Sequence, residues 1–212
     1  MPRATYALIH GAGDVAWYWH LVEPELRRLG HDTIAMDLPV DDDAADLDDY
    51  ADVVVDAIGD RRDAIIVAQS FGGYVAPIAG ARVGARMLVL VAGMVPAPGE
   101  TAEAMFANTG YPGSEQGGDV FYHDVDPALV AQARARGRTQ SATPGVQPWP
   151  LAAWPAIPTR FVLCQNDRMF PAAWLRRVVR ERLGIEPDEL ASGHTPALSH
   201  PRELVALLAR YS

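Results

Sequence analysis

The sequence predicts an α/β fold with a mainly parallel sheet of about six strands and helices on both faces. Short apolar runs alternate along the chain with amphipathic stretches of helical length. Most of these runs are apolar at nearly every position, not at every second one, which is typical of strands in a parallel sheet covered on both sides. The 212 residues are enough for one domain of this kind.

The elements follow in order along the chain. The apolar runs predict strands at residues 6–9, 33–36, 64–67, 87–91, 160–163 and 188–190. The stretches between them predict helices at residues 19–29, 50–58, 71–81, 172–183 and 201–211. Gly30 stands where a helix C-cap is expected, and Pro171 and Pro201 stand where a first helical turn tolerates proline. We expect residues 1–212 to form a single domain.

One segment, residues 96–155, departs from this alternation. It is rich in glycine, proline and alanine, its periodicity is weak, and only a helix at 127–136 is predicted within it. Long insertions of this kind are usually lids or binding loops. We therefore expect residues 96–155 to form a short cap-like insertion over the sheet.

The amino-acid composition limits the kinds of molecule that the protein is expected to bind and the compartment in which it is expected to work. The net charge of −9 disfavours nucleic acid and anionic membranes, because both would repel the chain. No apolar stretch approaches the roughly 18 residues of a membrane span, and the apolar run ending at Ile9 leaves no room for a signal peptide. The single cysteine, Cys164, excludes an internal disulfide and fits a reducing compartment. These features predict a cytoplasmic protein, and they leave its oligomeric state undetermined.

The chemistry begins at Ser70, which ends a β-branched run and is followed at once by Phe71, Gly72 and a helical pattern. This is the layout of a nucleophile elbow, in which a serine sits on a sharp turn between a strand and a helix. The turn requires small residues two positions before and after the serine. Those positions hold Ala68, where glycine is usual, and Gly72.

A serine nucleophile needs a base and an acid that orients the base. Asp167 follows the fifth predicted strand, and His194 follows the sixth. The carboxyl ends of parallel strands share one edge of the sheet, so these two residues can meet Ser70 there. The order Ser, Asp, His along the chain is that of α/β-hydrolases. An oxyanion hole would use the N–H groups of Phe71 and of Ala12, which lies in the loop after the first strand.

The motifs resemble those of the α/β-hydrolase superfamily. Within it, they are similar to the branch that holds the plant methyl esterases, the hydroxynitrile lyases and their bacterial relatives. The motifs that carry the resemblance are His10-Gly11-Ala12, Ala16-Trp17-Tyr18-Trp19, Asp37-Leu38-Pro39, Gln69-Ser70-Phe71-Gly72-Gly73, Asn166-Asp167 and Gly193-His194. The resemblance implies that Ser70 is the nucleophile, His194 the base and Asp167 its partner, with no metal and no organic cofactor.

Two positions separate this chain from the lyases of that branch. The lyases place a lysine after the catalytic histidine and a threonine after the histidine of the first loop. Thr195 and Gly11 stand at those positions here. The resemblance therefore implies a hydrolase acting on a small carboxylic ester. Candidate substrate-binding residues are Trp17, Met94, Tyr122 and His123.

Two alternatives to ester hydrolysis stay open from sequence. Gly11-Ala12-Gly13 with Ala16 fits the pattern G-x-G-x-x-A after a strand, and Asp37 ends the next predicted strand. That is the fingerprint of an NAD(P)-binding Rossmann-type reductase. The bulky residues at 17–19 do not suit a Rossmann-type site. The reductase interpretation also leaves the placement of Ser70, Asp167 and His194 at strand ends unexplained. The second alternative is a hydrolase-like protein that binds a ligand without turnover.

Overall fold

The computed structural model describes residues 3–212 and contains a six-stranded sheet in the order β2-β1-β3-β4-β5-β6. Every neighbouring pair of strands is parallel. The strands are β1 (Thr5–Ile9), β2 (Asp32–Ala35), β3 (Ala64–Gln69), β4 (Met87–Val91), β5 (Thr159–Cys164) and β6 (Asp188–Leu190). The predicted fold class is confirmed, and each predicted strand forms within about two residues of its expected bounds.

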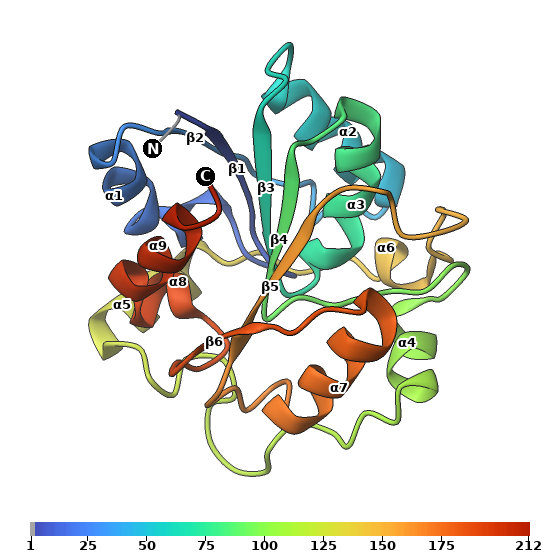
Figure 1. Cartoon of the computed structure of the whole chain (residues 1–212). Helices are drawn as coiled ribbons and strands as arrows, with labels where there is room; N and C mark the ends of the chain where they lie inside the picture. Colours follow the sequence, from blue (N-terminus) through green and yellow to red (C-terminus); the bar gives the residue numbers. More distant parts are fainter. Residues whose placement is uncertain (1–2) are drawn as a thin grey trace.

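Helices cover both faces of the sheet (Figure 1). One face carries α1 (Val22–Arg28), α8 (Pro196–Ser199), α9 (Pro201–Ala209) and the 3-10 helix η1 (Ala16–Trp19). The other carries α2 (Leu47–Ile58), α3 (Gly72–Val83) and α7 (Ala172–Leu183). Alternate side chains of β1 enter the two cores, with Tyr6 and Leu8 on one side and Ala7 and Ile9 on the other. No helix within residues 3–212 is long and apolar enough to cross a membrane.

The first predicted helix, over residues 19–29, is wrong at its start. The structure forms η1 there and begins α1 only at Val22. Pro24 explains the difference, because proline has no N–H and its ring clashes with the preceding turn of a helix. A helix from residue 19 would place Pro24 in its interior, whereas a helix from Val22 places it in the first turn.

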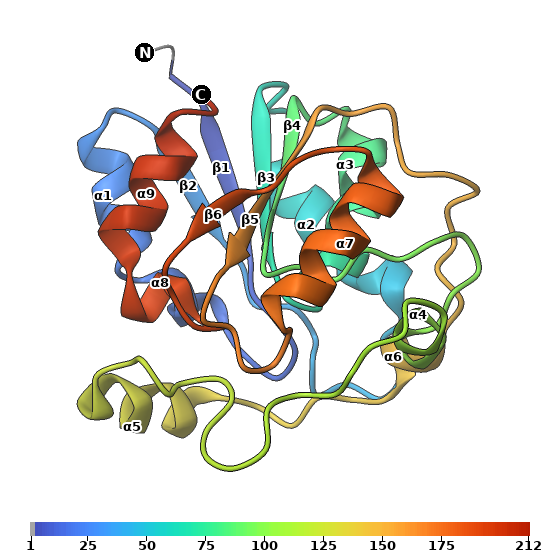
Figure 2. The ribbon, with the colours of Figure 1, turned by 60° about the horizontal axis from the view of Figure 1, so that its bottom comes forward.

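The segment between β4 and β5 contains α4 (Ala102–Asn108), α5 (Pro127–Arg136) and α6 (Thr143–Val146). Only α5 is predicted from sequence, and its bounds agree. Thr101 caps α4 by accepting a hydrogen bond from the Ala104 N–H at 3.1 Å. Figure 2 shows this green-to-yellow segment passing below the sheet, with α5 on one side and α4 and α6 on the other.

The strand order positions the loops that matter for chemistry. β1 lies between β2 and β3 in the sheet. The chain therefore runs from β1 outward to β2 and then passes back across β1 to β3 on its other side. In parallel sheets this arrangement opens a crevice at the carboxyl ends of the strands. The loops that follow β1, β3, β5 and β6 all begin at that edge.

A partly buried ion pair fixes the start of the inserted segment to α7. The Glu100 carboxylate accepts hydrogen bonds from Arg182 at 2.5 and 2.8 Å and from Asn108 at 2.9 Å. Burial alone would raise the pKa of Glu100, but the hydrogen bonds from Arg182, Asn108 and the Ala97 N–H outweigh it and hold the pKa below its usual range. The pair therefore stabilises the fold at neutral pH.

Replacing Glu100 with glutamine will lower the free energy of unfolding by about 2–3 kcal/mol, because Arg182 keeps its charge and loses its partner. Glu181→Gln removes an exposed partner of Arg177 and will cost less than about 0.5 kcal/mol. Because the folded pKa of Glu100 is depressed, the difference between wild type and Glu100→Gln is present at neutral pH and shrinks as pH falls below about 4. Urea unfolding at pH 7.5 and at about pH 3 measures both effects. Equal costs for the two variants at pH 7.5 would contradict the assignment.

Candidate active site

Ser70 sits between β3 and α3 in a strained backbone conformation. Its φ is 51°, in the left-handed region that residues other than glycine rarely adopt. Three backbone hydrogen bonds hold it there. Its N–H donates to the Val91 carbonyl at 3.2 Å, and its carbonyl accepts from Gly73 at 3.0 Å and Met94 at 2.9 Å. Backbone strain of this kind persists where surrounding structure enforces it, commonly at active sites.

Close packing explains the small residues around the turn. A Cβ added to Gly72 would lie 3.3 Å from the Ala68 Cβ and 3.1 Å from the His10 carbonyl oxygen. A Cβ added to Gly73 would lie 2.1 Å from the Met94 carbonyl oxygen. Alanine is therefore accommodated at position 68 because position 72 has no side chain, and the elbow keeps its shape.

Ser70, His194 and Asp167 form a continuous hydrogen-bonded chain. The Nε2 atom of His194 lies 3.0 Å from Ser70 Oγ, and its Nδ1 atom lies 2.8 Å from Asp167 Oδ2. Asp167 Oδ1 accepts hydrogen bonds from the N–H groups of Met169 and Phe170 at 2.8 and 2.9 Å. An ionised carboxylate only accepts, so it draws the proton of His194 to Nδ1 and leaves Nε2 free to accept from Ser70.

Neighbouring groups hold the His194 ring in this orientation. Gln69 Nε2 donates to the His194 carbonyl oxygen at 3.0 Å. The Phe170 ring meets the imidazole edge-on, with 5.0 Å between ring centroids. His194 and Asp167 are 2% and 3% exposed, so water competes little for their hydrogen bond. Gln69 belongs to the sequence motif around Ser70, but its contact with His194 could not be predicted, because it joins residues 125 positions apart.

The loop after β1 is shaped by His10, which is fully buried. Its Nδ1 atom donates to the Gly11 carbonyl at 2.8 Å, and its Nε2 atom accepts from the Leu38 N–H at 3.1 Å. Burial lowers the pKa of His10 to about 4, so the ring is neutral, which this pair of bonds requires. The loop places Ala12 at the mouth of the site. Neither the Ala12 nor the Phe71 N–H donates a hydrogen bond to another residue within 3–212.

A cavity of about 440 Å³ opens onto Ser70 and His194. Ala12 and Phe71 line it, together with two of the four residues predicted to bind substrate, Met94 and Tyr122. Further lining residues are Gly11, Gly13, Asp14, Gln69, Ala102, Phe106, Phe121, Arg138, Met169, Phe170 and Thr195.

The other two predicted substrate-binding residues, Trp17 and His123, do not line this cavity. Trp17 stacks on His20 with ring centroids 4.0 Å apart, and the Arg136 guanidinium lies 4.6 Å from its ring centroid. The Nε2 atom of His123 lies 3.0 Å from the carbonyl oxygen of Asn166. Both rings are engaged by other parts of the protein, so the structure does not bring these two residues together with Ser70 as the sequence-based assignment expected.

The inserted segment contacts both loops that carry His194 and Asp167. Asp124 Oδ2 accepts from the Gly193 N–H at 2.6 Å, directly before His194. His123 contacts Asn166, directly before Asp167. A Cβ on Gly193 would lie 2.5 Å from Asp124 Oδ1, so only glycine allows this approach. We therefore expect Asp124 to position the loop that carries His194, and its place in a segment without clear periodicity gave no sequence signal.

Replacing Asp124 with alanine will lower kcat for an ester by about tenfold and leave KM nearly unchanged, because His194 loses a fixed support but the cavity lining is intact. Asp124→Asn keeps an acceptor oxygen and will restore kcat to within about threefold of wild type. Asp126→Ala, which removes the cap of α5 in the same segment, is the matched control and will retain kcat. Steady-state kinetics on p-nitrophenyl acetate measure all three, and equal kcat for Asp124→Ala and Asp126→Ala would contradict the role.

The glycine pattern that resembles a dinucleotide fingerprint is occupied by the protein itself. The Gly13 N–H donates to Gln140 Oε1 at 2.9 Å, and the Gly13 carbonyl accepts from the Arg138 N–H at 2.7 Å. The element that follows is the four-residue η1, so the loop does not open a long helix that could bind a pyrophosphate. Asp37 accepts from the Ala16 N–H at 2.6 Å. The context that a Rossmann site needs is missing here.

The family is shown by comparison of sequences. The model of the alpha/beta hydrolase family matches residues 7–207. The chain belongs to this family. Curated relatives match over a shorter region: norfluorocurarine synthase 1 of Strychnos nux-vomica is 34% identical over 84 residues, which are 35% of this chain and 32% of that protein. The match thus spans about a third of the length of that relative.

Solved structures share the fold of this hydrolase over almost its whole length. Polyneuridine aldehyde esterase superposes with a TM-score of 0.83 at 18% identity, covering 99% of each chain. A pyrethroid hydrolase from Sphingobium faniae gives 0.80 at 21% identity over 99% of this chain and 97% of its own. The methylesterase MES16 of Arabidopsis gives 0.78 at 18% identity over 98% of each chain. The resemblance inferred from the motifs is confirmed for the superfamily, and its structural relatives include members named as esterases.

Proposed function

We propose that this hydrolase cleaves a small carboxylic ester through an acyl-enzyme on Ser70. The observation that carries the proposal is the hydrogen-bonded chain Ser70–His194–Asp167 at the wall of a cavity. A serine in a strained turn, an imidazole positioned to take its proton and a buried carboxylate behind the imidazole are the parts that acyl transfer needs.

The geometry suggests the following steps. His194 Nε2 removes the proton from Ser70 Oγ as that oxygen attacks the ester carbonyl. The free N–H groups of Ala12 and Phe71 donate to the oxyanion that forms, and Asp167 stabilises the charged imidazolium. His194 then gives its proton to the leaving alcohol, and the acyl group stays on Ser70. In the second half, His194 activates a water molecule that releases the carboxylic acid. Every step uses groups of this chain.

We propose that residues 1–212 act as one domain in which residues 96–155 form the cap. The cap supplies Ala102, Phe106, Phe121, Tyr122 and Arg138 to the cavity lining, so it selects the small-molecule substrate. Two structural relatives are named as esterases, which supports an ester as the substrate class. The buried, lone Cys164 and the acidic composition support a cytoplasmic protein without nucleic-acid or membrane partners.

Two positions favour hydrolysis over the cyanohydrin cleavage of the related lyases. A Cβ at Gly11 would lie 2.2 Å from Gln69 Oε1, so a threonine there would displace the side chain that supports His194. Thr195 stands where those lyases place lysine, and its hydroxyl donates to the Phe121 carbonyl at 2.8 Å. The site thus holds no ammonium group at the position that the lyases use.

Turnover of simple esters tests the proposal. The purified protein is mixed with p-nitrophenyl acetate and with a panel of methyl esters, and acid release is followed by titration at constant pH. We expect turnover of at least one ester, and loss of that turnover in His194→Ala, which removes the base. If His194→Ala hydrolyses the ester as fast as wild type, the mechanism is overturned. If wild type hydrolyses no ester and its melting temperature rises on adding NADPH, the reductase alternative is favoured.

A further inference from the structure

The cavity beside Ser70 has two chemically different walls. Met94, Phe106, Met169 and Phe170 form an apolar wall and belong to the core that packs around α3 and α7. Asp14 lies in the other wall, in the loop after β1, together with Tyr122 and Arg138 from the inserted segment. The apolar wall suits a hydrocarbon portion of a substrate. The polar wall has groups that ester hydrolysis itself does not use.

Asp14 is the least satisfied of these groups. Its Oδ1 atom accepts a hydrogen bond from the Val15 N–H at 2.8 Å. Its second oxygen accepts no hydrogen bond, and the carboxylate forms no ion pair, with any residue from 3 to 212. Burial, with a smaller contribution from the charge of Asp37, raises the pKa of Asp14 to about 6. A carboxylate at neutral pH that is partly removed from water and lacks a partner has unfilled capacity to accept hydrogen bonds.

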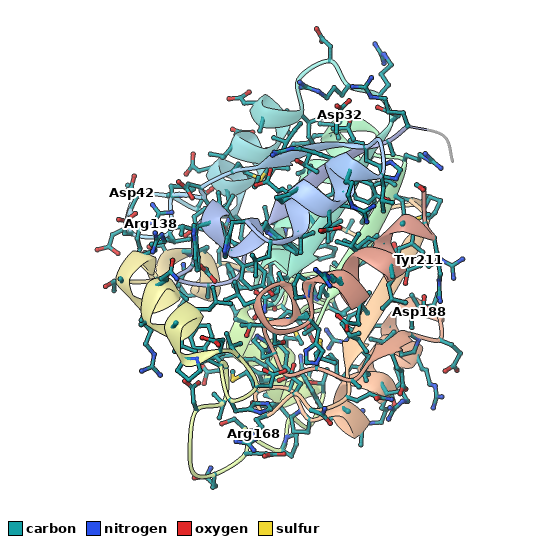
Figure 3. The ribbon with its side chains drawn as sticks, turned by 90° about the vertical axis from the view of Figure 1, so that its left-hand side faces the viewer. Asp32, Asp42, Arg138, Arg168, Asp188 and Tyr211 are labelled. Carbon is teal, nitrogen blue, oxygen red and sulfur yellow. The ribbon has the colours of Figure 1, made fainter. Side chains whose placement is uncertain are left out.

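The nearby guanidinium of Arg138 does not serve as a partner for the Asp14 carboxylate. Arg138 donates from Nη1 to Asp41 at 3.0 Å and from Nη2 to the Leu38 carbonyl at 2.5 Å. Figure 3 shows Arg138 beside the acidic loop that carries Asp42, and its ion pair there is with Asp41. The guanidinium thus serves to fix the inserted segment to the loop after β2.

Tyr122 supplies a hydroxyl on the same wall. Within residues 3–212 this hydroxyl makes no hydrogen bond. Burial and the charge of Asp14 raise the pKa of Tyr122 to about 12, so the group keeps its proton. This wall therefore offers the carboxylate of Asp14 as a hydrogen-bond acceptor and the protonated hydroxyl of Tyr122, which is close enough to be affected by the charge of Asp14.

We propose that Asp14 accepts a hydrogen bond from a donor group of the substrate, a hydroxyl or an ammonium, and that this protein selects esters carrying such a donor apart from the ester bond. The inference rests on the proposed ester hydrolysis and names its substrate class. An ester without the donor would displace water from Asp14 and leave the carboxylate unpaired, which is costly. An ester with the donor replaces that water with a fixed partner.

Matched pairs of esters test the selection on either side of the ester bond. Methyl 6-hydroxyhexanoate and methyl 6-aminohexanoate are compared with methyl hexanoate, and 4-hydroxybutyl acetate is compared with butyl acetate. We expect kcat/KM to favour the donor ester by about tenfold or more in at least one pair. If only the amino ester is preferred over methyl hexanoate, the donor that Asp14 binds is an ammonium group. If the amino and hydroxy esters are preferred equally, the hydrogen bond and not the charge decides the selection. Both results support the proposal.

Asp14→Asn is the decisive variant, because its amide oxygen can still accept from the Val15 N–H while its NH₂ group faces the cavity as a donor. The preference for donor esters will fall to about threefold or less. Asp60→Asn removes the same charge from an exposed position and will keep the wild-type preference. A donor preference in Asp14→Asn equal to that of wild type would overturn the proposal.

A binding measurement separates this inference from the proposed catalysis. In Ser70→Ala, which cannot form an acyl-enzyme, NMR titration with the same esters gives dissociation constants without turnover. We expect tighter binding of the donor ester by about tenfold, and loss of this difference in the double variant with Asp14→Asn. If binding shows the difference while wild type hydrolyses no ester, the catalytic proposal fails and the role of Asp14 stands. Equal binding of donor and matched esters in every pair would overturn the role of Asp14 whatever the turnover.

Discussion

Ser70→Ala will lower kcat for p-nitrophenyl acetate by about 10⁴-fold or more, because removing the nucleophile abolishes the acyl-enzyme route. The hydroxyl of Ser70 contacts His194 Nε2, so the change removes one hydrogen bond and leaves that ring nitrogen facing the cavity, while the bond between His194 and Asp167 is kept. Alanine can adopt the backbone of this position, since Ala92 of the same chain has a φ of 44°. The melting temperature will therefore stay within about 3 °C of wild type.

Ser199→Ala is the matched control for this experiment. Ser199 lies in α8, outside the lining of the cavity, and its hydroxyl lies 3.5 Å from the Thr195 carbonyl oxygen. This variant will keep the wild-type kcat. Retained turnover in a folded Ser70→Ala protein would remove Ser70 from the mechanism, and equal losses in both variants would show that the assay reports folding instead of chemistry.

Asp167→Asn will lower kcat by about 10⁴-fold while leaving the fold intact. The carboxylate accepts from His194 Nδ1 through Oδ2, and through Oδ1 it accepts from two backbone N–H groups that asparagine can also satisfy. With those N–H groups holding the amide oxygen, the NH₂ group faces Nδ1 and favours a proton on Nε2. The imidazole then donates toward Ser70 and cannot accept its proton.

Steady-state kinetics with Asp188→Asn as control measure this effect. Asp188 accepts from the Tyr211 hydroxyl at 2.6 Å and from Arg210 at 2.5 Å near the C-terminus, away from the cavity. We expect the control to keep kcat and to lose some thermal stability. A loss of less than about tenfold in Asp167→Asn would contradict the role of Asp167 as the partner of the base.

Features set by local sequence could be predicted well. Strand positions follow from short apolar runs, and the parallel sheet brings the ends of β3, β5 and β6 to one edge. The proximity of Ser70, Asp167 and His194 therefore follows from topology once the strands are recognised. The elbow also follows, because the need for small residues at positions 68 and 72 is a property of the turn itself.

Contacts made by the inserted segment could not be predicted. The sequence predicts both Tyr122 and His123 to bind substrate, and only the fold of the segment across the sheet edge decides that Tyr122 lines the cavity and His123 does not. Periodicity carries no information about such packing when a segment is rich in glycine and proline. Asp124 and Asp14 could not be predicted for a related reason. A single carboxylate in a loop has no sequence pattern that separates it from a solvated turn residue.

Covalent labelling tests the central claim most directly. The protein is incubated with a fluorophosphonate, which phosphonylates activated serine hydroxyls, and the modified peptide is located by mass spectrometry. We predict one label per chain, on Ser70, with labelling slowed strongly in His194→Ala because the base no longer removes the serine proton. A label on another residue, or no label on a folded wild-type protein that hydrolyses esters, would contradict Ser70 as the nucleophile.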